Sequence, residues 1–221
     1  FFGFPALRAL MDFSQKNLTR LQNEETAWTI LVDGDGDRSY VVLYDPFQDL
    51  LHVIDGDEAL FYQAIFLARS QKLNMIHLLA FTVESSVPFI NALMQNLKKY
   101  SPVQLLLTED TSIASDRIHL KLCPVGDKHI LRQQCIGSES SGHIVRPYHI
   151  IANDIQTKHK VFTGNGILSS LYTISAITSS LAVDKEMPFQ ERFQSLLSPY
   201  TRPHNDLVYI YFVNKKLWYR N

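Results

Sequence analysis

The chain has 221 residues, of which 46% are apolar and 19% are charged, and its formal net charge is -1. This is the composition of an average globular protein, and at this length roughly 70% of the surface of the unfolded chain can be buried. The near-zero charge, with no Lys/Arg run longer than two residues, argues against a nucleic-acid partner.

No apolar stretch reaches the roughly 18 residues of a transmembrane helix, so we expect no transmembrane segment. The two cysteines, Cys123 and Cys135, fit a reducing compartment, which predicts a cytoplasmic protein, or one in a host cytosol if it is secreted as an effector. Because the chain begins with Phe1 and lacks a basic signal-peptide start, we expect it to be a fragment.

The first half of the sequence predicts alternating strands and helices. A helix is expected over 5–21, and strands over 28–32 and 40–44 form a hairpin around the sharp break at 33–37. The elements that follow are a strand over 50–54, a helix over 58–69 with Asp57 as its N-cap, a buried strand over 75–81, a helix over 87–99 capped by Ser85 or Ser86, and a strand over 103–107.

The second half continues this pattern. Its predicted elements are strands over 117–122, 129–136, 148–152 and 159–162, helices over 167–181 and 188–197, and a terminal hairpin over 207–219. The Ser/Gly-rich segment 137–142 predicts a mobile loop. The fold class is therefore α/β (α+β), with a mixed β-sheet flanked by helices. We expect one domain over 1–221, with a division into 1–107 and 108–221 as the alternative.

The run from Asp33 to Asp37 looks at first like a calcium loop. Such a loop needs Gly at its sixth position and a bidentate Glu at its twelfth, whereas this sequence has Arg38 and Tyr44 there. The flanking segments are predicted strands rather than helices. We therefore interpret the run as a solvated hairpin turn.

A second group of metal-binding residue types lies further along the chain. Structural zinc sites prefer ligands in closely spaced pairs, and the intervals here are looser and irregular. The residues are His129, Cys135, His143 and His149. The sequence therefore predicts neither a metal nor a cofactor.

Gly164, Asn165 and Gly166 precede a predicted helix, and their backbone N–H groups could hold an anion. The segment has neither the ending of a Walker loop nor a dinucleotide fingerprint, so a plain helix entry is the other interpretation. Binding of a nucleotide or another small molecule here is one functional hypothesis.

No complete catalytic set can be read from the sequence. Nucleophilic catalysis needs a nucleophile, a base and an orienting group brought together by the fold. Neither cysteine precedes a helix that would lower its pKa, and there is no Gly-x-Ser-x-Gly elbow. The remaining candidates are Asp45, Ser86 and Cys135.

One stretch, about residues 24–99, resembles a known arrangement. The segment 27–32 is a strand with Trp28 as its second residue, and the segment 40–46 is a strand that ends in Asp45. A helix, a strand and a Ser-capped helix follow. This order is similar to that of the ubiquitin-like-protein-specific proteases and the related YopJ-type acetyltransferases, which implies a cysteine-protease-like core.

The positions that would carry that family's chemistry differ. Ala27 stands where the family has its catalytic His, and no Cys lies near Ser86, where the nucleophile would begin a helix. The resemblance therefore implies a pseudoenzyme. We expect a non-catalytic module that binds another protein as an adaptor, scaffold, effector or secretion-system component. The alternative is a hydrolase or acyltransferase of this class that uses Cys135 with His129, His143 or His149.

Aromatic residues near the C-terminal end supply the expected binding surface, because Tyr and Trp anchor protein interfaces well. Packing in the core is the other interpretation of the same residues. They are Tyr209, Tyr211, Trp218 and Tyr219.

Overall fold

The computed structural model describes residues 4–107, 110, 112–151 and 158–201. Its helices are α1 (Phe4–Lys16), α2 (Leu18–Leu21), α3 (Gly56–Arg69), a 3-10 turn (Leu73–Met75), α4 (Val87–Leu97), α5 (Asp127–Arg132), α6 (Gly166–Leu181) and α7 (Phe189–Leu197). Its strands are β1 (Trp28–Val32), β2 (Ser39–Asp45), β3 (Leu50–Ile54), β4 (Leu78–Thr82), β5 (Val103–Leu106), β6 (Ile118–Cys123), β7 (Ile136–Ser138), β8 (Ile144–Ile151) and β9 (Lys158–Gly164).

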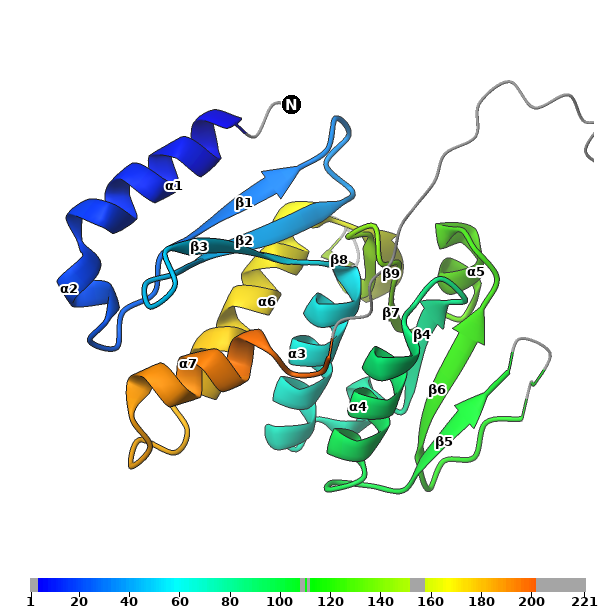
Figure 1. The fold of residues 1–221 in the computed structure, drawn as a ribbon. Helices are drawn as coiled ribbons and strands as arrows, with labels where there is room; N and C mark the ends of the chain where they lie inside the picture. The colour runs from blue at the N-terminus through cyan, green and yellow to red at the C-terminus, as the bar shows by residue number, and fades with distance from the viewer. Residues whose placement is uncertain (1–3, 108–109, 111, 152–157, 202–221) are drawn as a thin grey trace, which may run out of the picture.

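A small antiparallel sheet has the strand order β1-β2-β3 and is covered on both faces (Figure 1). Alternate residues of a strand point to opposite faces. Val42 and Tyr44 of β2 therefore pack with Leu10 of α1, whereas Val41 and Leu43 join the main core. This double covering explains why the sequence of β2 is a continuous apolar run.

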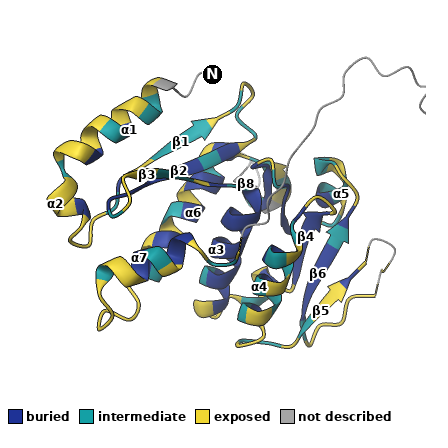
Figure 2. Ribbon diagram, viewed as in Figure 1, coloured by how far each residue is buried: buried dark blue, intermediate teal, exposed yellow. Residues whose placement is uncertain are grey.

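The larger sheet has the order β5-β6-β4-β7-β8-β9. Strands β5, β6, β4 and β7 run parallel, and β7, β8 and β9 are antiparallel neighbours. The central strand β4 is buried throughout, as is most of α3, which lies between the sheet and α6 (Figure 2). Helix α6 also packs against β2, so it links the two sheets.

Side-chain caps fix where the long helices begin. Asp55 accepts a hydrogen bond from Glu58 N at the start of α3, Ser86 accepts one from Phe89 N at the start of α4, and Asn165 accepts one from Leu168 N at the start of α6. The prediction of a Ser86 cap is confirmed. The cap of α3 is Asp55 and not Asp57.

Two predicted elements take another form. The helix expected over 5–21 is interrupted at Asn17, and the strand expected over 129–136 is instead helix α5 followed by β7. The sequence of α5 offers one buried apolar anchor, Ile130, which packs into a small core cluster beside β4. The predicted hairpin over 207–219 lies outside the described residues.

The α/β fold class with a mixed sheet flanked by helices is confirmed. The cysteine-protease-like core is not, because β1, β2 and β3 form one sheet and β4 belongs to the other. The division of the chain into domains stays a prediction. Among the described helices, none is long and apolar enough to cross a membrane.

Candidate functional site

The loop between β1 and β2 gathers carboxylates. Asp33 Oδ1 accepts hydrogen bonds from the backbone N–H groups of Gly36 (3.1 Å) and Arg38 (3.2 Å), which folds the loop back on itself. Asp33, Asp35 and Asp37 are thereby brought together, each offering one oxygen within 4.8 Å of the other two. We call residues 33–38 the Asp loop.

The Asp loop rests on the junction between β9 and α6. Gly166 N–H donates to the carbonyl of Gly36 at 2.8 Å. A β-carbon at position 166 would lie 2.6 Å from the carbonyl oxygen of Arg38, closer than atoms normally approach. Glycine at 166 therefore allows the loop to lie directly on the start of α6.

A turn between β7 and β8, residues 139–143, lies beside the Asp loop. Glu139 N–H donates to His143 O at 2.9 Å, and Gly142, with φ of 87°, completes the turn. Ser39 N–H then donates to Gly142 O at 3.1 Å, and Arg38 and His143 form an isolated antiparallel bridge. Backbone hydrogen bonds therefore hold the two loops side by side. We call residues 139–143 the Glu turn.

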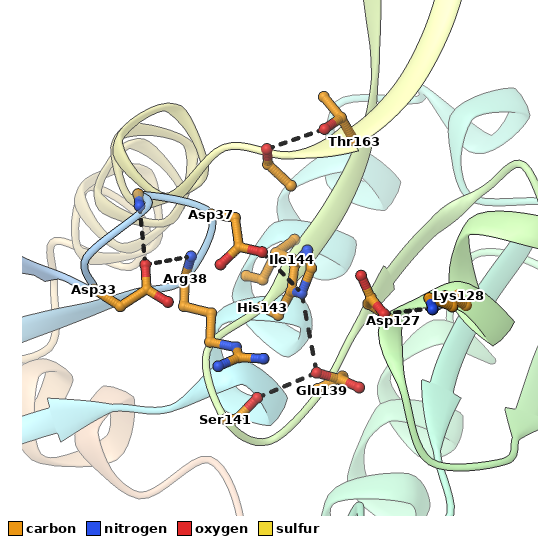
Figure 3. Close-up of polar contacts among 12 residues, drawn as sticks. Asp33, Asp37, Arg38, Asp127, Lys128, Glu139, Ser141, His143, Ile144 and Thr163 are labelled. Carbon is orange, nitrogen blue, oxygen red and sulfur yellow. Dashed lines mark hydrogen bonds and ion pairs between the residues drawn. The ribbon is translucent and has the colours of Figure 1, made fainter.

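His143 is the side chain that joins the two loops. Its Nδ1 lies 3.7 Å from Asp37 Oδ2 and 4.0 Å from Glu139 Oε2, and Figure 3 shows Asp37 and His143 pointing toward one another. The side chain is 3% exposed, and Nδ1 has no hydrogen-bond partner among the described residues. A buried ring nitrogen without a partner is costly, so this atom is suited to receive a ligand.

Polar groups surround this imidazole. Ser141 Oγ donates to Glu139 Oε2 at 3.3 Å, and Figure 3 shows the side chain of Arg38 extending from the Asp loop toward the Glu turn. The site therefore combines carboxylates, a hydroxyl, an imidazole and a guanidinium. Such a mixture can bind a cation and a polar, anionic small molecule together.

The carboxylates of the Asp loop differ in proton affinity. Burial raises the pKa of Asp37 against the opposing effect of His143, and the carboxylates of Asp35 and Asp33 raise it further. For Asp33, burial also raises the pKa, but hydrogen bonds from Arg38 N–H, the Asp37 side chain and Gly36 N–H outweigh it, so its pKa lies below the usual value. Mutual repulsion of this kind is relieved when a cation binds between the carboxylates.

The Asp loop fits a hard divalent cation such as Mg²⁺ or Mn²⁺. These cations prefer oxygen ligands, and Mg²⁺ is commonly held by carboxylates together with waters or substrate phosphates. Among the residues that the structure describes, this is where three His, Cys or carboxylate ligand atoms converge. The prediction of no metal followed from the mismatch of 33–38 with a calcium loop and from the irregular spacing of His129, Cys135, His143 and His149, and it stays untested.

The three candidate catalytic residues make their contacts in different parts of the fold. Asp45 accepts hydrogen bonds from Phe47 N and Gln48 N in the β2–β3 turn, whereas Ser86 caps α4. Cys135 is buried in the cluster beside β4, and burial raises the pKa of its thiol strongly. A thiol held in its protonated form is a poor nucleophile.

The predicted anion-binding residues lie under the Asp loop. Gly166 N–H already donates to Gly36, Leu168 N–H donates to the side chain of Asn165, and Gly164 packs against His143. Binding of an anion at 164–166 stays a prediction. The aromatic residues proposed for partner binding, Tyr209, Tyr211, Trp218 and Tyr219, lie outside the described residues.

No known protein-family profile matches the chain. In sequence, the chain is similar to a phosphoglucosamine mutase of Psychromonas ingrahamii, with 30% identity over 166 residues that make up 73% of this chain and 29% of that protein. The chain thus spans less than a third of the length of that relative.

Two solved structures show a looser likeness. One is the apo-form of an N-acetylglucosamine-phosphate mutase of the alpha-D-phosphohexomutase superfamily, with a TM-score of 0.41 and 14% identity, covering 86% of this chain and 34% of that one. The other is a provisionally named phosphomannomutase from Thermus thermophilus, with a TM-score of 0.45 and 19% identity, covering 84% of this chain and 34% of that one.

These comparisons correct the functional expectations. The likeness to ubiquitin-like-protein-specific proteases and YopJ-type acetyltransferases is wrong, because the sequence match is to a sugar-phosphate mutase and the expected core is split between two sheets. The expectation of a non-catalytic adaptor, pseudoenzyme or effector is wrong as well, because the relative is an enzyme. The hydrolase or acyltransferase alternative finds no support either.

Sequence reasoning missed the Glu turn, which it treated as part of a mobile loop. In the structure Glu139, Gly142 and His143 are buried, and strand β7 includes the first two residues of the loop predicted over 137–142. Two sequence features could have indicated the site. They are the three alternating aspartates of the Asp loop and the cluster of Glu, Ser and His at 139–143. Their juxtaposition depends on tertiary contacts that no local pattern reveals.

Proposed function

We propose that this chain forms part of a phosphohexomutase-type enzyme and binds a phosphorylated hexose together with a divalent cation. The observation that carries the proposal is the meeting of the Asp loop and the Glu turn, with His143 Nδ1 3.7 Å from Asp37 Oδ2. The sequence similarity to a phosphoglucosamine mutase supports the class of substrate.

The Asp loop would hold the cation through Asp33, Asp35 and Asp37. A divalent cation bound there would draw electron density from the phosphoryl oxygens of a substrate. Asp33 keeps its charge through the hydrogen bonds that its Oδ1 accepts within the loop. Arg38, exposed at the end of the loop, offers a planar donor that suits a phosphate group.

The Glu turn would hold the sugar. A carboxylate accepts hydrogen bonds from hydroxyl groups, so Glu139 can bind two hydroxyls of a hexose. Ser141 is exposed and can donate or accept beside it. His143, kept in place by both loops, can donate or accept a proton at Nδ1 on the side that faces Asp37 and Glu139.

Calorimetric titration of the chain with phosphorylated glucosamine, in Mg²⁺ and again in EDTA, tests this function. Because the chain spans less than a third of the relative's length, binding rather than turnover is the appropriate readout. We expect binding in Mg²⁺, weaker binding in EDTA, and loss of binding in Glu139→Gln. Equal heats for phosphorylated glucosamine and unphosphorylated glucosamine would contradict the proposal.

Two further properties belong with this proposal. A cytoplasmic location is supported by the two free, buried thiols of Cys123 and Cys135. Binding of another protein, which was expected from the sequence, stays a proposal.

A further inference from the structure

A buried arginine outside both loops has no carboxylate beside it among the described residues. Arg146, on β8, is 2% exposed and lies on the side of the large sheet that faces α3 and α6. Its Nη1 donates to Gln63 Oε1, and its guanidinium stacks on the ring of Tyr172 with Cζ 3.9 Å from the ring centroid. None of the ion pairs among the described residues includes Arg146.

Neither of these contacts neutralises the charge. The Gln63 amide is neutral and is itself fixed by its own hydrogen bonds, from Nε2 to Thr173 Oγ1 (2.9 Å) and to Ser169 O (3.2 Å). The ring of Tyr172 offers only the attraction of its π face. A buried charge is normally paired with an opposite charge, because its desolvation is otherwise uncompensated.

Two buried donors on the same face of β8 also lack acceptors among the described residues. Arg146 Nε and the hydroxyl of Tyr148 have no hydrogen-bond partner among the residues that the structure describes. Residues two apart on a strand point to the same face, so both groups lie on one side of β8. The hydroxyl of Ser169, which lies 3.4 Å from Ile144 O, is also within hydrogen-bonding reach of Tyr148. As a donor to the phenol oxygen it would still leave the Tyr148 O–H without an acceptor.

From this arrangement we propose that Arg146 Nε–H and Tyr148 O–H bind one small monovalent anion, such as chloride. A monovalent anion would neutralise the single positive charge of the Arg146 guanidinium. It would also accept hydrogen bonds from the two donors that lack an acceptor. A bound water would satisfy the donors but would leave the guanidinium unpaired. The inference does not depend on the proposed function.

The burial of the site sets the size of the anion. With Arg146 2% exposed, and with Ser169 and Thr173 each 1% exposed, the surroundings suit a halide better than sulfate or an organic anion. Burial lowers the pKa of Arg146, as expected for a cation removed from water without a carboxylate to compensate it.

Thermal unfolding in different sodium salts at one ionic strength tests the site. Because a ligand that binds only the folded state raises its stability, we expect Tm in 0.2 M chloride or bromide to exceed Tm in gluconate by about 3 °C or more. Arg146→Met should lose this difference and Tyr148→Phe should reduce it. Arg8→Met, which removes an exposed arginine, should keep it.

A second measurement covers the case in which Arg146→Met does not fold. Crystals of the unaltered protein grown in bromide should show an anomalous peak within hydrogen-bonding distance of Arg146 Nε and Tyr148 Oη. Equal Tm values in chloride and gluconate would overturn the proposal, even if a bromide peak appears at crystal concentration. A halide effect that survives in Arg146→Met would place the anion elsewhere and overturn it too.

Discussion

Gly164 lies directly against His143: a β-carbon at position 164 would fall 2.2 Å from His143 Nε2 and 3.1 Å from Asp37 O. Strand β9 therefore lies against both the imidazole of His143 and the backbone of the Asp loop at this position. Gly164 is in contact with both parts of the proposed site. Any side chain at 164 must displace His143, its neighbours or the strand.

Gly164→Ala should disturb both stability and binding. Overpacking of this kind costs about 1–3 kcal/mol in the free energy of unfolding, measured by urea denaturation. Because His143 must move, Mg²⁺-dependent binding of phosphorylated glucosamine should weaken as well. The matched control for stability is Gly34→Ala, where an added β-carbon meets nothing within 4 Å. Equal losses of stability in the two variants would show that the contact with His143 is not the cause.

Asp35→Asn should weaken cation binding by about tenfold or more, because removing one of three convergent carboxylates lowers the ligand charge of the site. Asp35 is exposed, so the fold should be unaffected. Titration with Mn²⁺, followed by the loss of its free electron-paramagnetic-resonance signal, measures the affinity. Asp12→Asn, on the exposed face of α1, should bind Mn²⁺ like the unaltered chain. If Asp35→Asn does so too, the Asp loop is not the cation site.

The stability of the fold should depend on pH through Asp57. Burial raises the pKa of this carboxyl to about 6, despite the hydrogen bonds from Ser85 Oγ (2.6 Å) and Ser86 N–H (3.2 Å). The folded state therefore holds the proton more tightly than the unfolded state, whose ordinary pKa is 3.8. The stabilisation is fully present below about pH 4 and is lost as pH rises through about 6.

The difference between a pKa of about 6 and one of 3.8 corresponds to about 3 kcal/mol. Urea denaturation of the unaltered chain and of Asp57→Asn between pH 4 and pH 8 measures it. The difference in free energy of unfolding between the two proteins should change by up to this amount across the interval, with the unaltered chain losing stability toward high pH. A difference that stays constant with pH would show that Asp57 has an ordinary pKa in the folded protein.

Cys135 should be unreactive in the folded protein. Its thiol is buried, and burial raises its pKa, so alkylation by iodoacetamide at pH 8 should be at least about a hundred times slower than in urea. Cys123 is buried as well and should behave in the same way. Rapid labelling of Cys135 alone, detected by mass spectrometry of peptides, would restore the case for a thiol nucleophile.

Sequence patterns predicted most of the elements but not the site. Runs such as β4 and β2 are apolar enough to identify strands, and Ser86 followed by Pro88 marks the start of α4. Helix α5 was missed because it is short and buries a single apolar residue, Ile130. Local periodicity carries little information about such an element.

The site depends on a contact that local patterns do not encode. Asp37 and His143 are 106 residues apart in the sequence and meet only because the Asp loop, the Glu turn and the start of α6 pack together. Gly164 and Gly166 allow that packing, yet in the sequence they resemble an ordinary helix entry. Their importance follows from what a β-carbon would meet in three dimensions.

Coupling between the two ligands tests the central claim most directly. If the Asp loop and the Glu turn form one site, the affinity for Mn²⁺ should rise about tenfold when phosphorylated glucosamine is present, and the affinity for the sugar phosphate should rise by the same factor in Mn²⁺. Glu139→Gln should abolish this increase while leaving the affinity for Mn²⁺ alone nearly unchanged. Identical Mn²⁺ affinities with and without the sugar phosphate would contradict the claim.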